Sequence, residues 1–132
     1  MMTFHLDATS GVPAYLQLVQ QVKRALRLGM LDRDDQLPTV KEVVGSLAIN
    51  PNTVLKAYRE LEREGLVVSR PGQGTFIKRA LPAAPPADLS ALRRGLLAWL
   101  RGAREAGLDA ESVLALFMST FRDAENEEEV SA

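Results

Sequence analysis

The sequence contains no cysteine and a single histidine, His5. Without cysteine the chain can form neither a disulfide nor a cysteine-ligated metal site, which is compatible with a reducing cytoplasm. Because that histidine lies close to a terminus that we expect to be mobile, we expect neither a histidine metal site nor a Ser/His catalytic pair. No pair of carboxylates and no nucleophile–base pair stands out. We therefore expect no metal, no cofactor and no enzymatic activity.

Long apolar runs are also missing. No run approaches the ~20 residues that a membrane-spanning helix needs. Residues 1–10 lack the basic region and apolar core of a signal peptide. We expect no membrane partner and a cytoplasmic location. A chain of 132 residues, 46% hydrophobic and 25% charged, suits one compact domain with a small appendage.

Charge is unevenly distributed along the chain. The formal net charge is −1, but residues 1–80 contain 11 Lys/Arg and 8 Asp/Glu, a net charge of +3. Residues 81–132 contain 5 Lys/Arg and 9 Asp/Glu, a net charge of −4. The N-terminal part is therefore the one that could meet phosphate.

Two helices are predicted in the first half of the chain. Residues 13–28 place an apolar stripe at helical spacing, with Pro13 in the first turn and Gly29 as the stop. That stripe is Tyr15, Val19, Val22 and Leu26. Residues 40–47 form a shorter helix, because Thr39 and Glu42 have the spacing of a capping box.

A third helix follows after a short turn. Asn50 is a good N-cap, Pro51 suits the first helical position, and Gly65 ends the helix. One side of this helix is apolar, with Val54, Tyr58 and Leu61. The opposite side is polar and basic, with Asn52, Lys56, Arg59 and Arg63. Such a helix can bury one face and offer the other to a DNA groove.

Residues 66–69 and 75–78 read as two short strands, joined by a turn rich in proline and glycine. Helix, helix, turn, helix and hairpin is the order of a winged helix-turn-helix, so we predict a mostly α fold with a small β-hairpin over residues 1–80. The recognition helix would enter the major groove, and the hairpin would approach the backbone or the minor groove. The predicted DNA-binding residues are Thr39, Lys41, Asn50, Asn52, Thr53, Lys56, Tyr58, Arg59, Arg70, Gly72, Gln73 and Gly74.

The remaining residues form an appendage. Residues 81–87 (LPAAPPA) predict a proline-rich linker, and residues 124–132 an acidic, disordered tail. Between them, residues 88–123 predict two helices, starting at Asp88 or Ser90 and at Asp109. The second helix is apolar over more than one stripe, which a two-helix appendage cannot bury alone, so we expect a homodimer. The predicted dimer interface consists of Leu92, Leu96, Trp99, Leu100, Val113, Leu114, Phe117 and Phe121.

Over about residues 11–79 the sequence resembles the GntR family of bacterial regulators. The matching positions are Pro13, Tyr15, Gln17, Leu37-Pro38, Leu47-Ala48, Thr53-Val54, Ala57-Tyr58, Leu61, Gly65-Leu66 and Gly72-x-Gly74-Thr75-Phe76. Two positions depart from the family pattern, with Thr39 in place of serine and Lys41 in place of arginine. The arginine often found before the Thr-Val pair is also absent, so Asn52 could read adenine there.

The short region after the linker resembles the YtrA-type subfamily. That resemblance implies a dimer formed through the C-terminal helices, and repression of transcription. The predicted function is thus a sequence-specific regulator that binds a palindromic operator on double-stranded DNA as a homodimer. A winged-helix module that binds proteins instead of DNA is the alternative, and the basic third helix counts against it. A small-molecule effector pocket between the C-terminal helices stays open.

Overall fold

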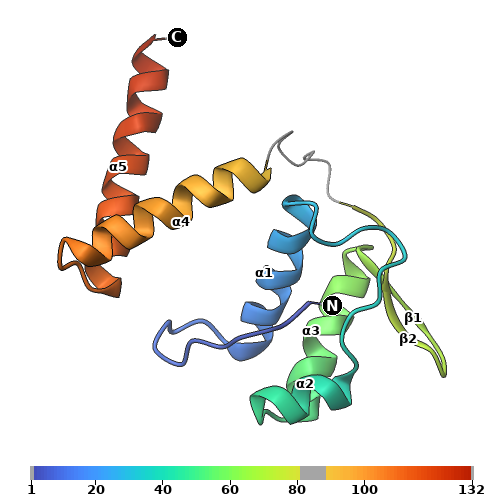
Figure 1. The fold of residues 1–132 in the computed structure, drawn as a ribbon. Helices are drawn as coiled ribbons and strands as arrows, with labels where there is room; N and C mark the ends of the chain where they lie inside the picture. Colours follow the sequence, from blue (N-terminus) through green and yellow to red (C-terminus); the bar gives the residue numbers. More distant parts are fainter. Residues whose placement is uncertain (1, 81–88, 132) are drawn as a thin grey trace. The chain divides into compact units, whose positions relative to one another are not determined.

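The computed structural model describes residues 2–80 and 89–131. It contains α1 (Ala14–Arg27), α2 (Val40–Leu47), α3 (Pro51–Arg63), β1 (Val67–Arg70), β2 (Gly74–Ile77), α4 (Leu89–Glu105) and α5 (Ala110–Ser131) (Figure 1). Contacts divide the chain into two compact units, one ending at Ala87 and the next beginning at Asp88. The predicted linker at 81–87 and the predicted cap Asp88 lie outside the described residues.

In the first unit α3 packs against α1, α2 and β1. It supplies four buried residues, namely Val54, Ala57, Tyr58 and Leu61. The core continues with Leu18, Val19 and Val22 of α1 and with Leu66 and Ile77 around the hairpin. Each fully buried aliphatic side chain contributes ~1.5–3 kcal/mol, so this cluster supplies the main stabilisation of the unit.

Local sequence sets the ends of these helices. The Thr39–Glu42 capping box forms at the start of α2, and the Asn50 side chain caps α3 through the N–H of Asn52. Gly65 adopts a positive φ of 78° after α3, where the Leu66 N–H bonds to the Leu61 carbonyl. That glycine ends the helix and turns the chain directly into β1.

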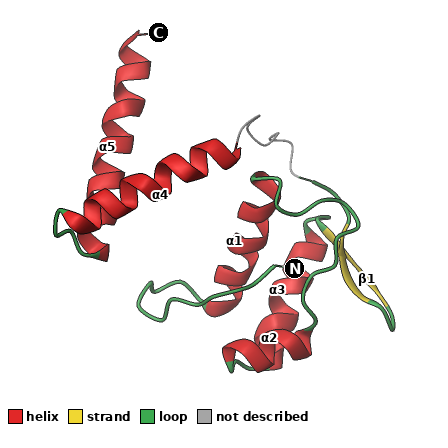
Figure 2. Ribbon diagram, in the orientation of Figure 1, coloured by secondary structure: helices red, strands yellow, loops and turns green. Residues whose placement is uncertain are grey.

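The two strands are antiparallel, with Val67 opposite Ile77 and Arg70 opposite Gly74 (Figure 2). The predicted strands were thus correct in kind and displaced by one residue toward the tip. The stretch 34–37 lies along β2, because the Leu37 N–H donates to the Thr75 carbonyl and Gln36 forms an isolated bridge with Phe76. The wing is therefore supported from its open edge.

The N-terminal segment is held in place, which corrects the expectation of a mobile terminus. The Gln17 amide donates to the carbonyls of Asp7 and Val12 and accepts from the Asp7 N–H. The Gln21 amide exchanges two hydrogen bonds with the His5 backbone. Phe4 is buried, its ring centroid 6.5 Å from that of Tyr58.

In the second unit α5 runs to Ser131, so the predicted disordered tail is helical as far as that residue. Residues 110–131 contain neither glycine nor proline, and alanine and glutamate are good helix formers. Nothing in the sequence stops the helix where the apolar pattern ends. The absence of an apolar stripe indicates exposure and does not by itself indicate disorder.

Candidate nucleic-acid interface

The outward face of α3 carries the first group of candidate residues. Asn52, Lys56 and Arg59 are exposed, whereas Val54 and Leu61 on the opposite side are fully buried. The Lys56 ammonium lies 4.1 Å from the centroid of the Tyr15 ring, a cation–π contact that holds it against α1. Arg59 forms no ion pair with any residue that the structure describes. Its charge is therefore available to an anionic partner.

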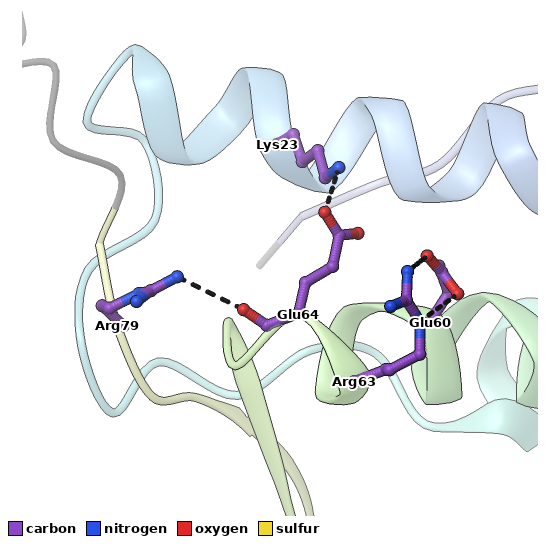
Figure 3. A network of polar contacts seen from close by, with 5 residues as sticks. All are labelled: Lys23, Glu60, Arg63, Glu64 and Arg79. Carbon is purple, nitrogen blue, oxygen red and sulfur yellow. Dashed lines mark hydrogen bonds and ion pairs between the residues drawn. The ribbon is translucent and has the colours of Figure 1, made fainter.

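Arg63 differs from Arg59. Its guanidinium contacts both carboxylate oxygens of Glu60, one of them at 3.1 Å from Nε (Figure 3). Hydrogen bonding to Arg63 lowers the pKa of the Glu60 carboxyl. Glu60 thus compensates the positive charge of Arg63, which leaves the first turns of α3 as its more cationic part.

Figure 3 also shows what fixes the other end of α3. The Lys23 ammonium of α1 is 2.7 Å from the Glu64 carboxylate. Arg79, beyond β2, donates to the Glu64 carbonyl at 3.2 Å. These contacts tie the C-terminal end of α3 to α1 and to the chain leaving the wing.

The turn of the wing requires glycine at two positions. Gly72 has φ 74° and Gly74 has φ 129°, conformations that L side chains rarely adopt. A Cβ at Gly74 would also lie 2.6 Å from the Gln36 amide nitrogen, which donates to the Gln73 carbonyl. The wing therefore presents Gly72 and Gln73 at an exposed tip with little side-chain bulk.

Arg70 stands at the base of that tip. Its guanidinium lies 4.3 Å from the Phe76 ring centroid and 3.2 Å from the Asp34 carboxylate. The side chains of Arg70 and Asp34 are 42% and 69% exposed. A pair so exposed contributes only ~0–1 kcal/mol. Arg70 can therefore exchange Asp34 for a phosphate at little cost.

A cleft of about 530 Å³ lies between the start of α2, α3 and the wing. It brings together seven of the predicted DNA-binding residues: Thr39, Tyr58, Arg59, Arg70, Gly72, Gln73 and Gly74. The other predicted residues, Lys41, Asn50, Asn52, Thr53 and Lys56, do not line this cleft. Lys41 is exposed in the first turn of α2, and the remaining four lie in or just before α3.

One predicted contact residue, Tyr58, does not fit this geometry. Tyr58 is 6% exposed, its hydroxyl donates to the Pro38 carbonyl at 2.6 Å, and burial raises the pKa of that hydroxyl. Tyr58 is therefore a core residue, and its hydroxyl proton is already donated to Pro38.

The first three positions of α3 offer no free N–H group to a phosphate. Pro51 has none, and the N–H groups of Asn52 and Thr53 bond to the Asn50 side chain and carbonyl. Any anion contact at this end of α3 therefore comes from side chains.

Three supporting residues were missed at the sequence level. Gln36 holds the wing, Asp34 pairs with Arg70, and Tyr15 receives Lys56. Tyr15 belongs to the apolar stripe of its helix and to the family matches, and neither fact indicates a contact with Lys56. Gln36 and Asp34 stand in a polar loop without periodicity, so only their position beside the Leu37-Pro38 pair could have drawn attention to them.

The predicted dimer residues are all in α4 and α5. Leu92, Leu96, Trp99, Leu114, Phe117 and Phe121 are exposed, with Leu92 at 62% and Phe121 at 53%, and Leu100 and Val113 are half-buried. Within residues 89–130, Ala103 alone is buried. The second unit therefore leaves most of its large apolar side chains in solvent.

Across residues 2–80 and 89–131 the side chains offer no cluster of acidic, histidine or cysteine groups that could hold a metal ion. Nor does any helix in those ranges combine the length and apolarity that crossing a membrane requires.

A recognition helix with an exposed polar face, a supporting α2 and a two-stranded wing define a winged helix-turn-helix protein. Residues 14–77 match the sequence pattern described as "Bacterial regulatory proteins, gntR family". The chain is 35% identical over 109 residues to the HTH-type transcriptional repressor YtrA of Bacillus subtilis, covering 82% of this chain and 84% of that protein. The protein belongs to the GntR family and resembles its YtrA-type members.

Solved structures of transcription regulators are also similar to this chain. A transcriptional regulator from Oenococcus oeni is 32% identical with a TM-score of 0.52, covering 88% of this chain and 97% of the other. YtrA from Sulfolobus acidocaldarius, a GntR-family transcription factor, is 28% identical with a TM-score of 0.53, covering 74% and 96%. The matched relatives are named as transcription regulators.

Proposed function

We propose that this protein is a transcriptional repressor that binds a palindromic operator as a homodimer. The observation that carries the proposal is the shared surface of α3 and the wing, where Arg59 and Arg70 line one cleft beside an exposed polar helix face. The Bacillus YtrA repressor, similar over most of both chains, supports repression as the outcome of binding. Such a regulator acts in the cytoplasm, where the bacterial chromosome lies.

The geometry of the site supports one way of docking on DNA. The first turns of α3 enter the major groove, where Asn52 reads a base edge, because Asn pairs in bidentate fashion with adenine. Lys56, Arg59 and Lys41 meet phosphates on either side. The wing tip approaches the backbone or the minor groove through Gly72 and Gln73, and Arg70 exchanges Asp34 for a phosphate.

The uncovered apolar side chains of α4 and α5 support a homodimer, because a second copy would bury them. A two-fold dimer reads two half-sites about 34 Å apart, or a multiple of that spacing. Palindromy of the operator would mirror the symmetry of the protein.

Fluorescence anisotropy against the protein's own promoter DNA and a scrambled duplex, at about 50 mM and about 200 mM salt, tests specific binding. We expect the promoter to bind about a thousandfold more tightly than the scrambled duplex, and more weakly at the higher salt. Equal, weak binding to both duplexes would contradict the proposal and favour a winged-helix module that binds proteins.

Three variants separate the roles assigned to the residues. Lys56→Ala and Arg70→Ala should weaken binding to both duplexes and reduce the salt slope by about 1 each, because each removes a phosphate contact. Asn52→Ala should leave the salt slope unchanged and reduce discrimination between the duplexes by about tenfold. Arg27→Ala, which removes a charge from the last turn of α1 outside the cleft, is the matched control. Unchanged binding by both Lys56→Ala and Arg70→Ala would refute the docking.

A further inference from the structure

A second cavity lies in the first unit, away from the residues assigned to DNA. Its volume is about 710 Å³, within the ~300–1,000 Å³ that is typical of small-molecule sites. It shares no lining residue with the cleft between α2, α3 and the wing. Its walls come from the N-terminal segment, the second half of α1 and the loop before α2. We call it the α1 cavity.

The walls of the α1 cavity contain the apolar side chains that the first unit leaves in solvent. Within residues 2–80 the exposed large hydrophobic side chains are those of Leu28, at 41%, and Met30, at 60%, and both line this cavity. Met2 and the buried Leu31 line it as well. Methionine is flexible, and its sulfur makes favourable contacts with rings, so these walls can adapt to an apolar or aromatic ligand. Exposed apolar side chains gathered in one hollow are typical of a ligand site.

Arg24 supplies a positive charge beside those apolar side chains. It lies one helical turn before Leu28, on the same face of α1. Its guanidinium forms no ion pair with any residue that the structure describes. Other polar groups of the cavity already have partners, because the Gln21 amide bonds to the N-terminal backbone and the Asp35 carboxylate accepts an N–H of its own loop at 2.8 Å. An arginine next to apolar side chains suits a carboxylate with an apolar body.

The loop before α2 connects the α1 cavity to the wing. Gln36 lines the cavity, and its amide donates to the Gln73 carbonyl at the wing tip at 3.1 Å. The adjacent Asp35, which also lines the cavity, accepts the Ile77 N–H of β2 through its carbonyl at 2.8 Å. A ligand that draws the Gln36 amide toward the cavity therefore removes a support of the wing tip.

We propose that the α1 cavity is an effector site for a small amphipathic carboxylate. Arg24 binds the anionic end of this ligand, and Met2, Leu28 and Met30 cover its apolar body. Bound ligand takes the amide of Gln36 away from the wing and weakens the contact between the wing and DNA. The effect on DNA rests on the proposed function, whereas the ligand site does not. Because coupling between two binding sites is reciprocal, operator DNA weakens binding of the ligand by the same factor.

NMR of the methionine methyl groups tests the site, because the chain has only four methionines. The probe is phenylbutyrate, added to the full chain with isotope-labelled methionine methyl groups. We expect the Met2 and Met30 signals to shift saturably, with half-saturation at about 1 mM or below, as a ligand of this size allows. Met118 of α5, which is 52% exposed, reports general adsorption to apolar surface and should not shift.

Two results of this titration would overturn the site. One is a shift of Met118 as large as those of Met2 and Met30. The other is the absence of any shift at Met2 and Met30 up to about 10 mM probe.

A change of head group tests the role of Arg24. Phenylbutanol has the same body without the charge and should bind about three- to fivefold more weakly than phenylbutyrate, as for a charge pair at an exposed site. Arg24→Gln should remove this preference and leave phenylbutanol binding unchanged. The matched control Arg27→Gln removes a charge from the same end of α1, outside the cavity, and should keep the preference. An undiminished preference in Arg24→Gln would overturn the assignment of a carboxylate.

Anisotropy with the promoter duplex tests the coupling, with ionic strength matched by chloride. Saturating phenylbutyrate should weaken DNA binding by about fivefold or more in the wild type, and by less than about twofold in Gln36→Leu, which lacks the amide. Methionine shifts without any change in promoter binding would overturn the coupling. Methionine shifts in a protein that does not bind its promoter even without the probe would instead refute the proposed function and support the ligand site alone.

Discussion

The two units of this protein differ in the burial of their apolar side chains. In the first, helices of 8 to 14 residues, too short to be stable alone, each bury a face in one core. In the second, helices of 17 and 22 residues keep most of their large apolar side chains exposed. The first unit buries its apolar side chains within a single copy, whereas the second leaves them exposed, and we propose that a partner covers them.

Leu61→Ala should destabilise the first unit and is the substitution from which we expect the largest effect. Leu61 is fully buried in α3, so we expect a loss of ~2–5 kcal/mol in the free energy of unfolding, measured by chemical denaturation. Leu28→Ala makes the same change at a leucine that is 41% exposed in the same unit, and should cost less than ~1 kcal/mol. Equal losses from the two substitutions would mean that the core does not lie where the structure places it.

Phe117→Asp should dissociate the proposed dimer without unfolding the first unit. A charge in place of an aromatic anchor should raise the dissociation constant of the dimer by ~30-fold or more, measured by light scattering over a dilution series. Ser119→Asp adds the same charge to another face of α5 and should stay dimeric. A Phe117→Asp variant that remains dimeric would show that α5 is not in the interface.

The smallest expected effect concerns the Asp109 side chain, which caps the start of α5. The Ser112 backbone N–H donates to the Asp109 carboxylate at 2.8 Å, which lowers the pKa of Asp109 below its usual 3.8. The stabilisation is therefore present above pH 3.8 and is lost as pH falls through the lowered pKa. Asp109→Asn keeps the acceptor and removes the titration. The acid-induced loss of helicity by circular dichroism should be slightly smaller in this variant, and identical titrations would contradict the role of the cap.

Sequence reasoning succeeded where structure is local. The Thr39–Glu42 box, the Asn50 cap and the Gly65 stop each depend on residues a few positions apart, so they could be read directly. The alternation of Val54, Tyr58 and Leu61 with Asn52, Lys56 and Arg59 gave the orientation of α3 for the same reason.

Sequence reasoning failed where the hydrogen-bond partner of a side chain lies far away in the sequence. Pro38 accepts the Tyr58 hydroxyl from 20 positions away, and Gln36 reaches the wing across 37. Neither glutamine nor a backbone carbonyl leaves a periodic signal. At the start of α3 the Asn50 cap was predicted correctly, and the same residue accepts the N–H groups of Asn52 and Thr53, which are then not free to bind phosphate.

The ordered N-terminal segment also has a consequence for how the chain is synthesised and handled. Phe4 packs on the ring of Tyr58, which follows more than fifty residues later in the chain. The burial of Phe4 therefore requires that α3 has already been synthesised. A purification tag fused directly to Met2 would extend from a segment that Gln17 and Gln21 hold against the body of the domain. A spacer between tag and chain is therefore advisable in any binding assay.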